Sequence, residues 1–166
     1  VALIDADLRK PRLAELFGLD PGAGLADVLA DRIALSAALR PIGMGKLFVL
    51  TAGTTPPNPA ELLGSPAMRD LLAQLRSACD IILIDSPPLL AVTDAAVLSR
   101  ESTGAVLIVA AGRTRARDLV SAATALSNAH APLLGTFLTM APTPSTGGTD
   151  YAGYGQPNLR DVSDRA

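Results

Sequence analysis

The sequence is poor in the residues that mark several classes of protein. It has one cysteine, no tryptophan and only 3% aromatic residues. A lone cysteine cannot form an internal disulfide, which excludes a small secreted scaffold held by such bridges. Cys79 stands just before an apolar run, and we expect it to be a small core residue in a reducing compartment. The scarcity of aromatic residues leaves a core of aliphatic and alanine side chains.

Excess charge of one sign and long apolar runs are also missing. The formal net charge of −2 gives no electrostatic case for nucleic-acid binding, so we expect no nucleic-acid partner. No apolar run approaches the roughly 20 residues of a membrane-spanning helix, and no signal peptide is visible. A chain of 166 residues, 49% of them hydrophobic, is long enough for one domain with a substantial core.

A phosphate-binding loop of the form Gly-x-x-x-x-Gly-Lys-Ser/Thr is missing as well. The nearest segment, 43–47, reads Gly-Met-Gly-Lys-Leu; it has no hydroxyl residue after the lysine and precedes a predicted strand, so we assign it to a turn. The chain opens on Val1 inside an apolar run, without Met, turn or cap. We therefore expect that the chain is truncated at its N-terminus and that a phosphate loop lies upstream.

Two apolar runs that end on aspartate are the most informative feature present. Residues 1–7 read Val-Ala-Leu-Ile-Asp-Ala-Asp, and residues 80–88 read Asp-Ile-Ile-Leu-Ile-Asp-Ser-Pro-Pro. Such short runs are typical of parallel strands buried on both faces. Either aspartate alone could simply cap a strand or begin a turn. Two matching units favour a magnesium–phosphate site, because parallel sheets bind ligands at the carboxyl ends of their strands and Mg²⁺ prefers oxygen ligands.

Strands and helices are predicted to alternate along the chain. We expect strands over 1–5, 46–51, 81–85, 105–110 and 133–139, and helices over 11–17, 25–31, 34–40, 59–78 with a break at 64–66, 93–98 and 115–129. This order predicts an α/β fold with a mostly parallel sheet flanked by helices. From Pro142 the composition turns to Pro, Ser, Thr and Gly, which predicts a domain over 1–141 and a flexible tail over 142–166.

The predicted sheet brings acidic and basic residues to one crevice. The strand ends that meet there are Asp5, Thr51, Asp85, Ala111 and Thr139, and the neighbouring loops carry Arg9, Lys10, Asn58, Asp94, Arg113 and Arg115. Acids for a metal and bases for phosphate would therefore converge. Arg9 and Lys10 could equally contact a neighbouring subunit or stay solvated, and Arg115 could be an ordinary surface charge.

Three segments resemble motifs of the bacterial tyrosine kinases, the cytoplasmic ATPase-like domains of exopolysaccharide chain-length regulators. Residues 1–11, Val-Ala-Leu-Ile-Asp-Ala-Asp-Leu-Arg-Lys-Pro, resemble the second Walker-type motif of that family. Residues 51–63, Thr-Ala-Gly-Thr-Thr-Pro-Pro-Asn-Pro-Ala-Glu-Leu-Leu, are similar to a characteristic loop and helix, and residues 80–88 resemble the Walker B strand. The three motifs occur in family order over about residues 1–140.

The resemblance implies a deviant Walker fold of the P-loop NTPase type, here without its phosphate-loop strand and helix. It implies ATP and Mg²⁺, with Asp5 and Asp7 as the catalytic acids and Asp5 and Asp85 near the metal. The cofactor contacts would be Arg9, Lys10 and Thr139. Thr139-Met140 stands where relatives carry the Asn-Arg pair that helps to seat adenine, so adenine recognition is expected to differ.

The resemblance also implies a function and partners. Tyr151 and Tyr154, the only tyrosines in the chain, would accept phosphate on the tail of a neighbouring subunit in a ring-shaped homo-oligomer. The protein would be an autokinase that regulates exopolysaccharide and capsule synthesis and export. It would act in the cytoplasm at the inner face of the cell membrane, with a membrane-embedded chain-length regulator domain in the same or another chain.

Two other functions stay open at this point. The chain could belong to a non-kinase ATPase switch of the septum-site or plasmid-partition type, or it could be a polysaccharide co-polymerase module that has lost nucleotide chemistry. We also expect residues 1–166 alone to be inactive and poorly stable, because a missing first strand would leave central strands with unpaired backbone groups.

Overall fold

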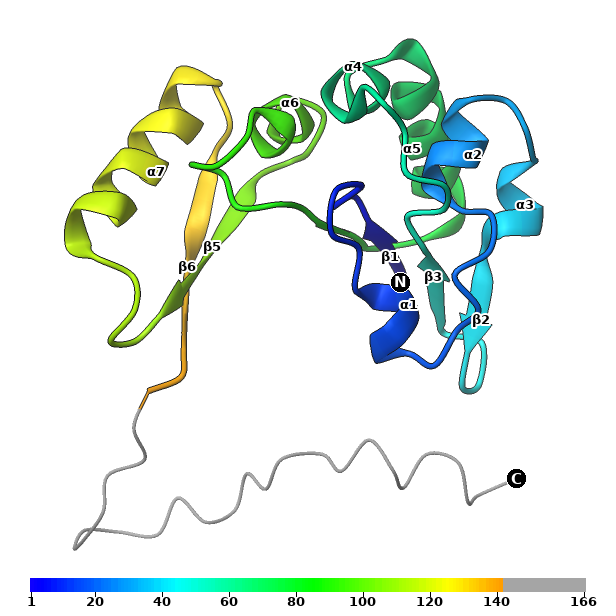
Figure 1. Cartoon of the computed structure of the whole chain (residues 1–166), viewed down its shortest axis with the longest axis horizontal. Helices are drawn as coiled ribbons and strands as arrows, with labels where there is room; N and C mark the ends of the chain where they lie inside the picture. The colour runs from blue at the N-terminus through cyan, green and yellow to red at the C-terminus, as the bar shows by residue number, and fades with distance from the viewer. Residues whose placement is uncertain (142–166) are drawn as a thin grey trace, which may run out of the picture.

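The computed structural model describes residues 1–141, which form an α/β domain (Figure 1). The predicted tail, with Tyr151 and Tyr154, lies outside the described residues. None of the helices within 1–141 combines the length and the apolar character needed to cross a membrane.

The predicted alternation of strands and helices is confirmed, with one element missed. The elements are β1 (Ala2–Asp5), α1 (Leu13–Leu16), α2 (Leu25–Leu29), α3 (Leu35–Ala38), β2 (Arg40–Ile42), β3 (Leu47–Leu50), α4 (Pro59–Leu63), α5 (Pro66–Ala78), β4 (Ile82–Asp85), α6 (Asp94–Ser99), β5 (Ala105–Ala110), α7 (Ala116–Asn128) and β6 (Leu133–Thr139). The prediction extended the third helix to residue 40, where β2 begins instead. Pro41 cannot continue a helix, because it lacks the N–H that the helical ladder needs.

β2 is antiparallel to β3, and the segment between them is the expected turn. Gly43 and Gly45 lie there in the left-handed region, with φ of 58° and 74°. Glycine populates this region without steric cost. The segment that looked like a partial phosphate loop is therefore a hairpin connection.

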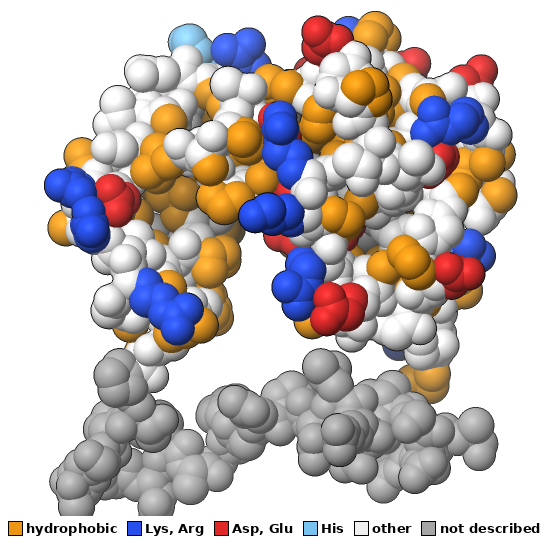
Figure 2. Space-filling view, viewed as in Figure 1, with side chains coloured by type: hydrophobic (Ala, Val, Ile, Leu, Met, Phe, Trp, Pro, Cys, Tyr) orange, Lys and Arg blue, Asp and Glu red, His pale blue; other side chains and the backbone are white. Residues whose placement is uncertain are grey.

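The strands form two sheets, whereas the sequence predicted one. The first sheet has the order β2-β3-β1-β4, in which β1 is parallel to both β3 and β4, and the second holds β5 and β6 in parallel. Among residues 1–141, β4 pairs only with β1, and β5 pairs only with β6. A groove of about 790 Å³ is lined by residues of both unpaired edges, and Figure 2 shows the hollow between the β5–β6 unit and the rest of the molecule. Among the described residues, β4 and β5 therefore each have one edge without a paired strand.

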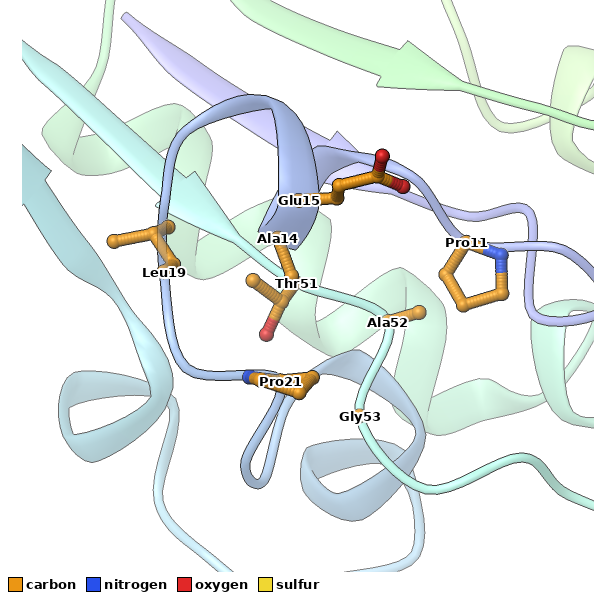
Figure 3. Close-up of a pocket in the computed structure, with 8 residues that line it drawn as sticks. All are labelled: Pro11, Ala14, Glu15, Leu19, Pro21, Thr51, Ala52 and Gly53. Atoms are coloured by element: carbon orange, nitrogen blue, oxygen red, sulfur yellow. The ribbon is translucent and has the colours of Figure 1, made fainter.

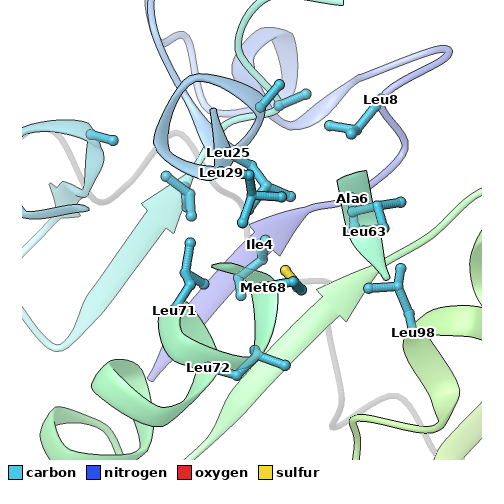
Figure 4. Packing of buried hydrophobic residues seen from close by; sticks show 14 of the residues in the cluster. Ile4, Ala6, Leu8, Leu25, Leu29, Leu63, Met68, Leu71, Leu72 and Leu98 are labelled. Atoms are coloured by element: carbon cyan, nitrogen blue, oxygen red, sulfur yellow. The ribbon is translucent and has the colours of Figure 1, made fainter. Parts of the chain in front are cut away.

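The main core is built around β1. Ala2 and Ile4 are fully buried, and leucines of α2, α4 and α5 pack around Ile4 (Figure 4). The prediction that both aspartate-ended strands are buried on both faces holds for β1 but is wrong for β4. Ile81 and Leu83 are 52% and 53% exposed, because they face the groove at the open edge of the sheet.

Candidate active site

Asp5 and Asp85 meet at the carboxyl ends of two neighbouring strands. They are paired in register between β1 and β4, and the N–H of Ala6, just beyond, donates to the carbonyl oxygen of Asp85 over 2.8 Å. Adjacent strands lie roughly 4.8 Å apart. The sequence predicted this convergence, and the structure places the two residues on the same edge of the sheet.

Asp5 is fully buried, and its two carboxylate oxygens differ. Oδ2 accepts hydrogen bonds from the backbone N–H groups of Arg12 and Leu13, over 3.0 and 2.9 Å, and so fixes the start of α1. Oδ1 has no hydrogen-bond partner among the described residues. A buried carboxylate oxygen without a partner is costly. One oxygen therefore has a structural role, and the other is left for a cation, a proton or a ligand.

Asp85 is exposed beside this buried acid. Desolvation raises the pKa of the Asp85 carboxyl, the negative charges of Asp5 and Asp7 raise it further, and the backbone N–H of Ser86 offsets part of the shift. Repulsion between neighbouring carboxylates is what a bound cation relieves.

Asp5 and Asp85 suit a Mg²⁺ ion that takes most of its ligands from water and phosphate. Within residues 1–141, no group of three or more potential metal-binding side chains comes together. Mg²⁺ is usually held by one or two carboxylates, several waters and the phosphates of a substrate. The unsatisfied Oδ1 of Asp5 and the repelled carboxylate of Asp85 fit such an arrangement, in which the protein supplies two ligands directly or through water.

Asp7 lies on the loop that follows β1. Its Oδ1 accepts hydrogen bonds from the backbone N–H groups of Arg9 and Lys10, over 3.1 and 2.9 Å. The carboxylate is half-buried, and Lys10 is exposed next to it. Asp7 thus begins a turn, as the simpler interpretation allowed, and it also stands at the same edge as Asp5 and Asp85.

Arg9 is committed to an acidic residue of α6. Its Nε and one terminal nitrogen donate to the two carboxylate oxygens of Asp94, over 2.8 and 3.2 Å. Asp94 is fully buried, whereas the Arg9 side chain is 43% exposed. The ion pair therefore ties the loop after β1 to the helix that follows β4, and a phosphate contact by Arg9 remains a prediction.

Thr139 lies on the second sheet. It ends β6, and its hydroxyl donates to the carbonyl oxygen of Val109 over 3.4 Å. Its contact with a cofactor stays a prediction. Arg113 and Arg115 belong to the connection from β5 to α7.

Asp27 organises the other flank of β1 and was missed by the sequence analysis. It accepts hydrogen bonds from Gly24 N–H, Thr54 N–H, the Thr54 hydroxyl and the Arg32 guanidinium. Burial alone would raise its pKa, but the N–H groups of Thr54 and Gly24, then Arg32 and the Thr54 hydroxyl, hold the pKa of Asp27 well below its ordinary range. An acidic residue in the first turn of a predicted helix was readable in the sequence, because such residues favour helix N-termini. The hydrogen bonds of Asp27 with Thr54, 27 residues away, could not be read from the sequence.

Two glycines let the loop after β3 approach α2 closely. The N–H groups of Leu25 and Ala26 donate to the carbonyl oxygens of Thr51 and Ala52, over 2.7 and 2.9 Å. A Cβ on Gly24 would lie 2.2 Å from the Thr51 carbonyl oxygen. A Cβ on Gly53, whose φ is +77°, would lie 2.2 Å from Asp27 Oδ2. Only glycine fits at either position.

Comparison with known proteins gives a consistent result. No protein-family model matches the chain. The tyrosine-protein kinase YwqD of Bacillus subtilis is 40% identical over 138 residues, which are 83% of this chain and 58% of YwqD. The tyrosine-protein kinase etk of Escherichia coli K12 is 36% identical over 83% of this chain, but the match covers only 19% of etk. The chain thus spans well under two thirds of these relatives.

Comparison with solved structures finds bacterial tyrosine kinase domains as well. The VpsO kinase domain superposes with a TM-score of 0.81 at 33% identity, over 85% of this chain and 70% of that domain. The kinase domain of Escherichia coli ETK gives 0.78 at 33% identity, over 89% of this chain and 60% of that domain. The cell division ATPase MinD of Pyrococcus furiosus, 24% identical with a TM-score of 0.66, shares the fold alone.

Proposed function

Since the chain belongs to the bacterial tyrosine kinase family, we propose that its protein transfers the γ-phosphate of ATP to tyrosine residues of its own kind. One observation carries the proposal, the in-register pairing of Asp5 with Asp85 at the ends of β1 and β4. Asp7 adds a third carboxylate on the loop just beyond. Phosphoryl transfer needs positioning and charge neutralisation more than covalent help, and this edge of the sheet offers both.

The reaction can be written with these groups. The tyrosine oxygen attacks the γ-phosphorus, and its O–H bond breaks as the new O–P bond forms. The bond from the γ-phosphorus to the β–γ bridging oxygen breaks, and ADP leaves with that electron pair. The proton passes to a carboxylate, for which Asp5 and Asp7 are the candidates. The products are phosphotyrosine and ADP.

Mg²⁺ would be held by Asp5 and Asp85, where it would neutralise phosphate charge. The nucleotide would lie over the carboxyl ends of β4 and β5, at the groove between the two sheets. Lys10 is exposed and available to phosphate, while Arg9 keeps the loop in place through Asp94. Thr139 ends β6 in the second sheet, and we infer that it contacts the base.

The partners follow from the same family membership. We place the acceptors at Tyr151 and Tyr154 of a neighbouring copy within a ring-shaped oligomer. The proposed setting is the cytoplasmic face of the cell membrane, next to a chain-length regulator that controls exopolysaccharide and capsule export. The low share of etk covered by this chain supports a regulator region within such relatives.

The test uses the full-length protein and radiolabelled ATP. Asp5→Asn is expected to lower tyrosine labelling at least a hundredfold, within the range of about 10² to 10⁴ for a lost acid–base group. The matched control is Asp80→Asn, an exposed aspartate just before the opposite end of β4, which should label like the wild type. Phosphopeptide mapping should find the label on Tyr151 or Tyr154.

Other outcomes would favour the other functions. Steady ATP hydrolysis with no labelled tyrosine would point to a partition-type switch. Failure of the full-length protein to bind nucleotide would point to an inactive export module. Undiminished labelling in Asp5→Asn would remove the proposed role of Asp5.

A further inference from the structure

The loop after β1, residues 6–12, is held at three points. Leu8 is buried in the main core, and the end of the loop is hydrogen-bonded to the carboxylate of Asp5. Between these two anchors, the side chain of Arg9 reaches α6 and forms its ion pair with Asp94. The middle of the loop is therefore connected to a distant element of the fold through Arg9.

The end of this loop also borders empty space. A cavity of about 280 Å³ lies between the segment that runs from the loop into α1 and residues 51–53, which follow β3. Pro11, from the end of the loop, and Ala52 both line this cavity (Figure 3). The residues after β3 thus do not close around the loop, and its position depends on its other anchors.

The backbone of the loop orients the Asp7 carboxylate. Oδ1 of Asp7 accepts hydrogen bonds from the N–H groups of Arg9 and Lys10, over 3.1 and 2.9 Å. Both bonds end on Oδ1, so Oδ2 is left to take up a proton or to face a ligand. A shift of residues 9 and 10 would turn this carboxylate, because the two N–H groups move with the backbone. Arg9 thus joins Asp7, through its N–H, to Asp94, through its guanidinium.

The ion pair of Arg9 with Asp94 is suited to fixing geometry. Two nitrogens of the guanidinium donate to the two oxygens of the Asp94 carboxylate, and such bidentate pairs define orientation as well as energy. Asp94 is fully buried, and a buried ion pair often adds little stability compared with apolar residues of similar volume. Asp94 also opens α6, the first helix after Asp85. The pair therefore connects the loop that carries Asp7 to the segment that follows Asp85.

The Arg9 guanidinium is committed to this contact. The hydrogen bond with Asp94 raises the pKa of Arg9, as do the negative charges of Asp94 and Asp7, while desolvation offsets part of the rise. Arg9 is therefore charged and lies within the electrostatic reach of Asp7. The edge of the guanidinium formed by Nε and one terminal nitrogen is occupied by Asp94, so that edge is not free for a phosphate.

We propose that Arg9 and Asp94 are a positioning pair for the transfer of phosphate. Asp94 holds the guanidinium of Arg9, and Arg9 fixes the backbone N–H groups that orient Asp7, one of the two candidate acids for the tyrosine proton. Neither member of the pair touches the phosphate in this role. The inference rests on the proposed kinase function and adds two residues that act through Asp7.

The test compares variants of the full-length protein. Arg9→Gln and Asp94→Asn each remove one partner, a double variant removes both, and Arg9→Lys keeps the charge but lacks the fork that binds two carboxylate oxygens. Arg12→Gln is the matched control, because the ion pair of Arg12 with Glu15 is exposed on both sides. Circular dichroism verifies that each variant is folded. The measurements are tyrosine labelling with radiolabelled ATP, the affinity for ATP, and hydrogen exchange over residues 6–12.

The kcat of labelling is expected to fall at least tenfold in Arg9→Gln and in Asp94→Asn, because a misplacement of about 1 Å costs up to roughly a hundredfold. The affinity for ATP should be unchanged in both. The double variant should be no slower than the slower single variant, since both substitutions break the same connection, and Arg9→Lys should lie between Arg9→Gln and the wild type. Hydrogen exchange over residues 6–12 should be faster in both single variants, and Arg12→Gln should match the wild type throughout.

The opposite results separate this inference from the kinase function. Weaker ATP binding in Arg9→Gln but not in Asp94→Asn would show that Arg9 contacts phosphate, and would overturn the inference. Wild-type kcat in folded Asp94→Asn would also overturn it, while leaving the kinase function intact. A wild-type protein that labels no tyrosine would overturn the kinase function instead. Hydrogen exchange then decides on the pair: faster exchange in both single variants supports its hold on the loop, and unchanged exchange overturns it.

Discussion

The two flanks of β1 differ in how far the folded chain satisfies its own polar groups. On the β3 flank, Asp27 is buried and accepts hydrogen bonds from three residues, Gly24, Arg32 and Thr54, and glycines allow close backbone contact. On the β4 flank, Asp85 is repelled by two other acids and Oδ1 of Asp5 lacks a partner among the described residues. The first flank is complete as folded. The second keeps uncompensated negative charge, which the proposed Mg²⁺ would relieve.

This contrast is what a phosphotransferase requires. A rigid flank preserves the geometry of the site, because its hydrogen bonds do not depend on other ligands. The uncompensated negative charge of the other flank lowers the stability of the free protein, and the proposed Mg²⁺ and nucleotide would restore it on binding. Replacing Asp27 and replacing Asp85 by Asn should therefore change stability in opposite directions.

The largest loss of stability is expected at Gly53. Gly53→Ala places a methyl group against Asp27 and the Gly24 backbone at a positive φ, and should cost about 3 kcal/mol or more from strain and overpacking. Gly43→Ala is the matched control, since φ there is +58° but no atom lies within 4 Å. That control should cost only about 1 to 2 kcal/mol. Urea unfolding measures the free energy of unfolding of both variants. Equal losses would mean that the close approach of residue 53 to Asp27 does not contribute to the cost.

Asp27 should carry an acid-sensitive share of stability. Asp27→Asn replaces a charged acceptor and is expected to cost about 2 to 3 kcal/mol at pH 7. Because the folded-state pKa is lowered, this contribution is present above the unfolded value of about 3.9 and is lost as pH falls below it. The free energy of unfolding measured from pH 7 to pH 3 should therefore fall more steeply in the wild type than in the variant. The exposed Asp20→Asn serves as control, and parallel curves for wild type and Asp27→Asn would contradict the assignment.

The Arg9–Asp94 ion pair joins the loop after β1 to α6, the helix that follows β4. Arg9→Gln leaves the buried Asp94 carboxylate without its cation and should lower the stability of the folded protein. Asp94→Asn removes that charge and should cost less. Arg12→Gln is the control, because its ion pair with Glu15 is exposed on both sides and should be worth under about 0.5 kcal/mol. Thermal or urea unfolding gives the free energy of unfolding of the three variants. A larger loss in Arg12→Gln than in Arg9→Gln would show that the Arg9–Asp94 pair does not stabilise the fold.

The smallest effect is expected at Asp85, and its sign is opposite. Asp85→Asn should raise the stability of the free protein at pH 7 by a few tenths of a kcal/mol, an amount typical of exposed charges. Because the folded-state pKa of Asp85 is raised, the wild type is relatively more stable at low pH and loses this advantage as pH rises through that value. The gain in Asp85→Asn should therefore vanish near pH 3. A variant less stable than the wild type at pH 7 would show that Asp85 has a structural partner.

Local pattern was enough to predict most of the fold. The two aspartate-ended runs predicted β1, β4 and the edge of the sheet at which both strands end. This was possible because the length and residue types of a strand are visible in the local sequence. The antiparallel β2 was lost because Arg40–Ile42 is too short to show alternation. The exposure of β4 was misjudged because a short apolar run looks the same at the centre of a sheet and at its edge.

The candidate site was predicted less completely. Asp5 and Asp85 could be placed because each ends a strand. Asp27 could not, since its hydrogen bonds to Thr54 depend on how α2 docks against the loop after β3. The pairing of Arg9 with Asp94 likewise joins residues 85 positions apart, which no local pattern records.

The central claim is that Asp5 and Asp85 share one divalent cation. The direct measurement is calorimetric titration of Mn²⁺ into the full-length protein with a non-hydrolysable ATP analogue, for the wild type, Asp85→Asn and Asp80→Asn. The account predicts that Asp85→Asn binds Mn²⁺ at least tenfold more weakly while Asp80→Asn binds like the wild type. Equal affinity in all three proteins would contradict it.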